Sequence, residues 1–277
     1  MIDDHKAFQP AAGIDREPLQ TVPGEALRRA RERTPARILT GRAGGSYTTS
    51  TWLELRRDHA SARDAVRTEL DLERDLGRDV VDRWDLFEVA TLAASKDEYL
   101  LRPDLGRALS EPARAEILAR RPSGVDVQLV IGDGLSAAAV AAQVPRLLPE
   151  LADQFNHAGL AMGRPFFVRH CRVGVMNDVG ELLNPAAVAL LIGERPGLAT
   201  AESLSVYMAH RPRAGDDDSR RNLISNIHAR GVPIDQAARR VVHLILQMID
   251  RQTSGVSVKE TWTAALSTPP RSLPESS

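Results

Sequence analysis

The sequence predicts an α/β fold in which a helical N-terminal region precedes a Rossmann-like, mostly parallel sheet with flanking helices. Between Thr40 and about Arg121, apolar residues recur at steps of three and four, which is the period of a helix that buries one face. From Asp126 onward, short apolar runs alternate with helical segments, an order typical of parallel strands joined by helices. One run, Ala187–Ile192, is apolar throughout, as expected for a strand covered on both faces.

We expect four segments along the chain. Residues 1–35 are rich in proline, arginine and glutamate, and form a flexible arm with one helix near Gly24–Arg33. Residues 36–122 form a helical domain, and residues 123–262 form the α/β domain. Residues 263–277 are rich in proline and serine and form a disordered tail.

The helical segment contains two recognisable helix starts. Thr48–Thr51 supplies several N-cap side chains in front of an apolar stripe. Residues 79–86 fit either a short helix or a strand that leads into Phe87–Val89. A proline-started turn at Arg102–Arg107 precedes a further helix at Glu111–Arg120.

The α/β segment is expected to contain four strands and four helices. The expected strands are Val127–Ile131, a second strand that begins at Phe166–Val168 and ends at Val173, then Ala187–Ile192 and Ser205–Ala209. The expected helices are Ser136–Ala141, Arg146–His157 beyond Pro145, Asn177–Leu183, and an amphipathic helix from Pro233 to Ile249. Ligands of open α/β sheets bind outside the carboxyl ends of the strands, so we expect a site in the loops after the first three strands. These loops are Gly132–Gly134, the stretch around Val173, and Gly193–Gly197.

The composition excludes several classes of protein. The chain has 36 basic and 37 acidic residues, a balance that does not favour binding to nucleic acid or to an anionic membrane. The single cysteine, Cys171, excludes an internal disulfide and suits a reducing compartment. The acidic start lacks the apolar run of a secretory signal, and the longest apolar stretches are too short to span a bilayer. We therefore expect a cytoplasmic protein with neither nucleic-acid nor membrane partners.

No motif of a common catalytic chemistry is found. Gly41–Ser46 lacks the lysine of a phosphate-binding loop and fits a flexible lead-in to a helix, although anion or partner contact stays open. Gly132–Gly134 lacks a third glycine and fits a turn with a helix start. Neighbours on a strand point to opposite faces, so His170 and Cys171 do not form a catalytic pair, and Asp216–Asp218 fits a solvated loop better than a metal site. We therefore predict no catalytic residue and no metal ligand, which suggests a binding or partner subunit.

Ten segments together resemble one known family in their order and approximate spacing. They are Thr40–Gly44, Asp58–Val66, Tyr99–Arg107, Asp126–Ser136, Gly163–Arg169, Asp178–Glu181, Leu191–Leu198, Glu202–Ser205, Ile224–His228 and Ser254–Val256. From about residue 35 to residue 258, the chain is similar to the light (small) chain of ethanolamine ammonia-lyase. The resemblance implies a subunit of an adenosylcobalamin-dependent enzyme that converts ethanolamine to acetaldehyde and ammonia by a radical mechanism. It also implies a catalytic heavy chain as partner, with six copies of each chain in a hetero-oligomer.

The resemblance carries three cofactor-binding positions onto this chain: Val173, Glu194 and Leu223. Val173 is expected at the end of the second strand, where a backbone group reaches the corrin, although ordinary core packing is the alternative. Glu194 is expected to accept hydrogen bonds from corrin amides, with a salt bridge to Arg195 or Arg169 as the alternative. Leu223 departs from the family, because some relatives have cysteine there and leucine cannot repeat a thiol contact.

Two other functions are compatible with the residues alone. An independent small-molecule-binding α/β domain without a lyase partner is supported by fold-level analogy. A scaffold subunit without any ligand contact is the second. The sequence does not decide whether the assembly enters a bacterial microcompartment.

Overall fold

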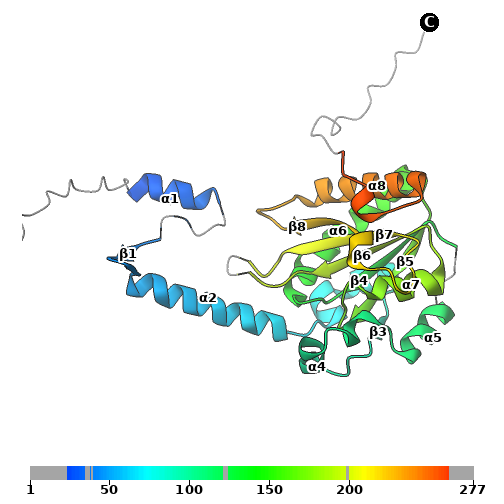
Figure 1. Cartoon of the computed structure of the whole chain (residues 1–277), viewed down its shortest axis with the longest axis horizontal. Coiled ribbons are helices and arrows are strands. Elements are labelled where there is room, and N and C mark those ends of the chain that lie inside the picture. The colour runs from blue at the N-terminus through cyan, green and yellow to red at the C-terminus, as the bar shows by residue number, and fades with distance from the viewer. Residues whose placement is uncertain (1–23, 35–37, 39, 121–123, 198–199, 262–277) are drawn as a thin grey trace, which may run out of the picture. The chain divides into compact units, whose positions relative to one another are not determined.

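The computed structural model describes residues 24–34, 38, 40–120, 124–197 and 200–261 (Figure 1). The contacts divide the chain into two units, with the division between Tyr47 and Thr48. The first unit contains α1 (Gly24–Glu32) and a hairpin of β1 (Arg42–Ala43) and β2 (Ser46–Tyr47). Within the glycine-rich segment, Gly44 has a φ of 63° and turns the hairpin, a backbone conformation that glycine adopts without strain. The remainder of the predicted arm, residues 1–23, and the predicted tail lie outside the described residues.

The second unit contains the sheet and its helices. The helices before the central strands are α2 (Thr49–Arg67), the π-helical turn η1 (Leu72–Leu76), α3 (Arg78–Trp84), α4 (Lys96–Leu101), the 3-10 turn η2 (Leu105–Arg107) and α5 (Glu111–Arg120). The later helices are α6 (Ala137–His157), α7 (Val175–Leu183), η3 (Asp218–Arg220), α8 (Ile234–Arg251) and η4 (Gly255–Ser257). The strands are β3 (Glu88–Ala90), β4 (Val127–Gly132), β5 (Met162–Arg169), β6 (Ala187–Gly193), β7 (Leu204–His210) and β8 (Asn222–Ile227).

Six strands form one mixed sheet in the order β3-β5-β4-β6-β7-β8. The first four are parallel, whereas β7 and β8 are antiparallel to their neighbours. The predicted α/β fold with a mostly parallel sheet is therefore confirmed. Two strands are not among the four expected in the α/β segment: β3, from the segment predicted to be helical, lies at one edge, and β8 lies at the other edge. Of the two alternatives for residues 79–86, the helix is formed, as α3, and β3 follows it. β8 is short and polar (Asn-Leu-Ile-Ser-Asn-Ile) and only partly buried, so it lacks the apolar run of the central strands.

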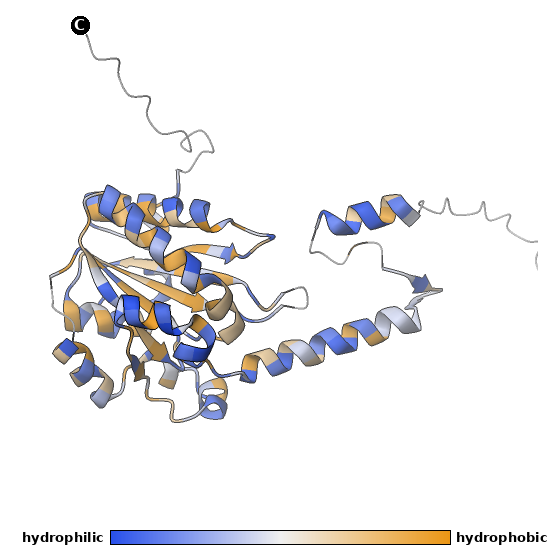
Figure 2. Cartoon of the chain, turned by 180° about the vertical axis from the view of Figure 1, so that it is seen from behind, coloured by the Kyte–Doolittle hydropathy of each residue, from blue (hydrophilic) through white to orange (hydrophobic). Residues whose placement is uncertain are grey.

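Helices cover both faces of the sheet, and each face has its own hydrophobic core. The core of α6 and α8 contains Leu129, Ile131, Leu191 and Val206, whereas the core of α5 and α7 contains Val130, Phe166, Leu190 and Ile192. Successive side chains of a strand point to opposite faces, which explains why all six residues of β4 are buried. Figure 2 shows the central strands mostly in orange between helices of mixed colour.

One predicted break is absent. The sequence predicts separate helices on either side of Pro145, but α6 runs for 21 residues with Pro145 and Pro149 inside it. A proline in a helix costs about 3 kcal/mol because it lacks the N–H donor. Burial of apolar side chains offsets this cost, since Val144, Leu147 and Leu151 are fully buried against the sheet.

The connections determine where a ligand can approach the sheet. The chain leaves β4 through α6 on one face and leaves its neighbour β5 through α7 on the other face. Between two such strands the loops diverge and open a crevice at the carboxyl ends. No helix in the described part of the chain is long and apolar enough to cross a membrane.

Candidate functional site

A cavity of about 260 Å³ lies at this crevice, and we call it the strand-end cavity. It is lined by residues from the loops that follow β4, β5 and β6, together with the last two residues of β6 and one residue each from α4 and β7. The lining residues are Tyr99, Gly134, Leu135, Cys171, Arg172, Val173, Ile192, Gly193, Glu194, Arg195 and Tyr207. The structure thus brings together all three loops that the sequence predicts at strand ends.

Two glycines let the loops after β4 and β6 meet. A Cβ atom on Gly134 would lie 2.3 Å from the carbonyl oxygen of Gly193, and Gly134 has a φ of 58°. A Cβ atom on Gly193 would lie 2.1 Å from the carbonyl oxygen of Ser136. The close approach is held by a 3.0 Å hydrogen bond from the Leu135 amide to the Gly193 carbonyl. These glycines are therefore required for packing of the cavity floor.

A buried ion pair, Lys96 with Asp133, connects these loops. The Asp133 carboxylate is 3.3 Å from the Lys96 ammonium, and the two side chains are 1% and 8% exposed. Asp133 also accepts a 2.8 Å hydrogen bond from the Cys171 amide, while Lys96 donates to the Gly134 carbonyl at 3.2 Å. The carboxylate thereby ties the loop after β4 to the loop after β5 and to α4. No sequence pattern indicates this pair, because 37 positions separate its members.

Tyr99 forms the side of the cavity next to this pair. Its hydroxyl donates a 2.9 Å hydrogen bond to the Cys171 carbonyl. Burial raises the pKa of the Tyr99 phenol far above its ordinary value, and the nearby Asp133 carboxylate raises it further. Burial likewise raises the pKa of the Cys171 thiol, with Asp133 again adding to the effect. Both groups therefore stay protonated at neutral pH and act as structural elements of the wall.

Two of the three predicted cofactor positions line the strand-end cavity. Val173 is predicted to end a strand, but β5 ends at Arg169, and Val173 lies in the turn before α7, packed partly against the core under that helix. Glu194 directly follows β6 and is half-buried. Leu223 does not line the cavity: it lies on β8 opposite Tyr207, which does, and its surface is 42% exposed.

The hydrogen-bond partner of Glu194 is a serine. Its carboxylate accepts a hydrogen bond from the buried Ser205 hydroxyl on β7. The alternative salt bridge to Arg169 is not formed, because that guanidinium pairs with Glu88 at 2.7 Å and with Glu69 at 3.4 Å. Burial and the Glu194 carboxylate together raise the pKa of the neighbouring Tyr207 phenol. Glu194 thus lines the cavity, and Ser205 holds its carboxylate in place.

Two arginines of the cavity are not among the predicted residues. Arg172 lies over the Tyr99 ring at 4.2 Å from its centre, and its Nε is buried without a hydrogen-bond partner among the described residues. Arg195 follows Glu194 and is exposed at the rim. Each directly neighbours a predicted position in the sequence, but nothing in its residue type distinguishes it from the other arginines of the chain.

The other sequence candidates have structural roles. Asp217 caps η3, and Asp218 pairs with Arg107 and Arg221, so the aspartate run organises a loop. In the described ranges, no group of three or more histidine, cysteine or acidic side chains is placed to hold a metal ion. His170 stacks on Tyr99 at 5.8 Å between ring centres.

Comparison with known proteins identifies the family. The family model described as ethanolamine ammonia-lyase light chain matches residues 24–259. The chain is 41% identical over 236 residues to the ethanolamine ammonia-lyase small subunit of Clostridium perfringens, covering 85% of this chain and 78% of the relative. The small subunits of Clostridioides difficile and Listeria monocytogenes are 40% and 39% identical over 235 residues, with the same coverage of both chains.

The chain belongs to the ethanolamine ammonia-lyase light chain family. Its function is that of a light subunit of this lyase, and the alternative of an independent binding domain is not favoured. The matched range includes the whole strand-end cavity and Leu223. The family assignment and the geometry therefore apply to the same part of the light chain.

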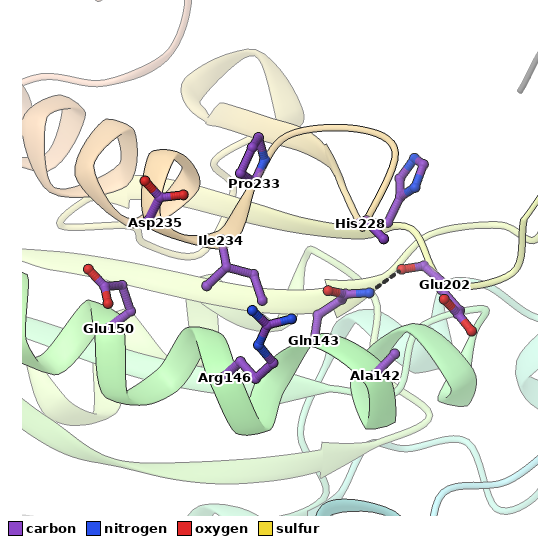
Figure 3. Close-up of a pocket in the computed structure, with 10 residues that line it drawn as sticks. Ala142, Gln143, Arg146, Glu150, Glu202, His228, Pro233, Ile234 and Asp235 are labelled. Carbon is purple, nitrogen blue, oxygen red and sulfur yellow. Dashed lines mark hydrogen bonds between the residues drawn. The ribbon is translucent and has the colours of Figure 1, made fainter. Parts of the chain in front are cut away.

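A second, larger cavity of about 630 Å³ lies elsewhere on the light chain, and we call it the helix groove. Figure 3 shows it between α6 and the start of α8, with Arg146 and Glu150 on one side and Asp235 on the other. Gln143 closes one end by donating a 3.2 Å hydrogen bond to the Glu202 carbonyl. The groove shares no lining residue with the strand-end cavity.

Proposed function

We propose that the light chain forms one wall of the adenosylcobalamin site of ethanolamine ammonia-lyase and that the strand-end cavity is this wall. The observation that carries the proposal is the convergence of three strand-end loops, with a fixed carboxylate and two arginines, on one cavity. The edge of a corrin ring carries carboxamides, which offer both N–H donors and oxygen acceptors. The cavity offers the complementary groups, including the buried Arg172 Nε that has no partner among the described residues. The residues therefore fit the cofactor.

Each predicted position has a distinct task in this proposal. The Glu194 carboxylate accepts hydrogen bonds from corrin amides, and Ser205 holds it in orientation. Val173 offers its backbone at the turn before α7, where the chain is not engaged in the sheet. Leu223, exposed on the edge strand β8, supplies an apolar contact next to Tyr207.

The partner in this proposal is the catalytic heavy chain, with six copies of each chain in the assembly. When bound, adenosylcobalamin supplies the radical chemistry that converts ethanolamine to acetaldehyde and ammonia, and the heavy chain holds the substrate. The light chain binds and orients the corrin and excludes water from it. A location within a bacterial microcompartment is compatible with this role, and fractionation of cells for the assembled enzyme tests it.

Cobalamin affinity tests the proposal. In the complex of heavy and light chains, we expect Val173→Trp to weaken cyanocobalamin binding by at least about tenfold, because an indole in the wall overlaps the ligand. Equilibrium dialysis with absorbance detection measures the dissociation constant. The matched control is Ala142→Trp in the helix groove, which we expect to bind as the unmodified complex does. Unchanged affinity for both Val173→Trp and Glu194→Ala would mean that the cofactor lies elsewhere.

A further inference from the structure

Arg172 has more hydrogen-bonding capacity than the chain uses. A guanidinium has five N–H donors, and the described hydrogen bond of this side chain is a long one of 3.4 Å, from Nη2 to the Tyr99 carbonyl. Its Nε is shielded from solvent and has no acceptor among the described residues. Buried polar groups are nearly always paired, so an unpaired donor at a cavity wall indicates a missing acceptor.

The position of Arg172 does not depend on such an acceptor. Its backbone amide donates a 2.7 Å hydrogen bond to the Gly106 carbonyl, and its guanidinium stacks on Tyr99. The Tyr99 ring is in turn held by the hydrogen bond of its hydroxyl to the Cys171 carbonyl. The side chain is therefore oriented in advance, which lowers the entropy lost when a ligand binds.

The charges around the cavity favour an oxygen acceptor as the ligand group. Glu194 is the one acidic residue of the lining, against the two arginines, Arg172 and Arg195. Behind the wall, Asp133 is neutralised by Lys96. Among the described residues, no ion pair neutralises either arginine of the lining. An electron-rich oxygen bound there gains charge-assisted hydrogen bonds.

We infer that Arg172 is a further cofactor-binding residue, whose guanidinium donates to an acceptor oxygen of cobalamin. The inference rests on the proposed function. Cobalamin has two kinds of such oxygen: the carbonyls of the carboxamides on the ring and the phosphodiester of the nucleotide tail. Arginine binds either, and its planar fork favours the bidentate geometry that a phosphodiester allows.

Two corrinoids distinguish these sources. In the complex of heavy and light chains, we expect Arg172→Gln to weaken cyanocobalamin binding about 10- to 100-fold, as for the loss of a charge-assisted hydrogen bond. Dicyanocobinamide lacks the nucleotide tail and its phosphodiester. If the loss occurs with both ligands, a ring carboxamide is the acceptor, and if only cyanocobalamin is affected, the phosphodiester is. Unchanged affinity for both ligands overturns the inference.

Three controls separate binding from folding. Arg146→Gln in the helix groove removes the same charge from a different cavity and is expected to change neither affinity. Thermal unfolding of each complex shows whether the variant is intact. If Arg172→Gln does not assemble, Arg172→Lys is measured in its place. Lysine keeps the charge near Tyr99 but lacks the planar fork, so we expect several-fold weaker binding of cyanocobalamin. Unchanged affinity of Arg172→Lys contradicts the inference. If Glu194→Ala and Val173→Trp lower the affinity for cyanocobalamin but the Arg172 variants do not, this inference alone is refuted. If none of these substitutions lowers the affinity, the proposed function is refuted.

Discussion

The strand-end cavity encloses about 260 Å³, whereas the helix groove encloses about 630 Å³. The smaller cavity is assembled from loops that glycines bring into contact and that a buried ion pair braces. The larger one lies between two helices, and charged side chains such as Arg146 and Glu150 line it. The two cavities thus differ in their supporting structure more than volume alone suggests, and a ligand is held best by groups that are fixed before it arrives.

The largest effect is expected from removal of the buried Lys96 ammonium, which supports the strand-end cavity. We expect Lys96→Met to lower the free energy of unfolding by about 3–5 kcal/mol, because it leaves the Asp133 carboxylate buried without a counter-charge. Urea unfolding followed by tryptophan fluorescence measures the change. The control, Arg240→Met, breaks a more exposed pair with Glu260 and is expected to cost about 1 kcal/mol or less. Equal losses for the two variants would show that the brace has no special importance.

Substitution of Gly134, with Gly159 as the control, tests how closely the loops after β4 and β6 approach each other. We expect Gly134→Ala to cost about 2–4 kcal/mol, from its left-handed backbone and from the clash of the new Cβ with the Gly193 carbonyl. Gly159 also has a positive φ, of 70°, but a methyl group added there would have no neighbouring atom within 4 Å. Gly159→Ala is therefore expected to cost only about 1 kcal/mol. If the two substitutions prove equally costly in urea unfolding, the contact between loops is not tight.

Loss of the hydrogen bond that orients Glu194 is expected to have a smaller effect, and only on cofactor binding. Ser205→Ala removes the hydroxyl that donates to this carboxylate. A net hydrogen bond is worth about 0.5–1.5 kcal/mol, so cyanocobalamin affinity in the complex should fall about 2- to 12-fold. Titration by absorbance gives the affinity. The same titration with Ser254→Ala, whose hydroxyl accepts from the His210 amide at the other end of β7, is the control; a loss of equal size there would argue against an orienting role for Ser205.

The smallest effects are expected in the helix groove. We expect Arg146→Gln and Glu150→Gln to change the free energy of unfolding by no more than about 0.5 kcal/mol, since substitutions on such solvated surfaces seldom do more. Cyanocobalamin affinity should stay within about twofold of the unmodified complex. A tenfold loss of cyanocobalamin affinity in either variant would indicate that the helix groove, and not the strand-end cavity, binds the cofactor.

Much of the fold could be predicted because the apolar pattern of each central strand reports its burial directly. The run Ala187–Ile192 and the stripe of α8 are of this kind. The polar edge strand β8 and the continuous helix through Pro145 could not be predicted, because pairing with β7 and burial of α6 depend on distant residues. At the candidate site, the order of strands and helices predicted which loops meet, and the family resemblance pointed to Val173 and Glu194 within them, although β5 ends four residues before Val173. The spare donors of Arg172 could not be predicted, because they depend on which acceptors the folded chain leaves out of reach.

The family, the α/β class and the three loops that meet at the carboxyl ends of the strands can be inferred from the residues alone, since they follow from local pattern and order along the chain. How the loops are held together depends instead on contacts made after folding. The pairing of Lys96 with Asp133, the contact of Gly134 with Gly193 and the stacking of Arg172 on Tyr99 join residues that are far apart in the chain. Such contacts depend on distances in space, which no local pattern of residues encodes.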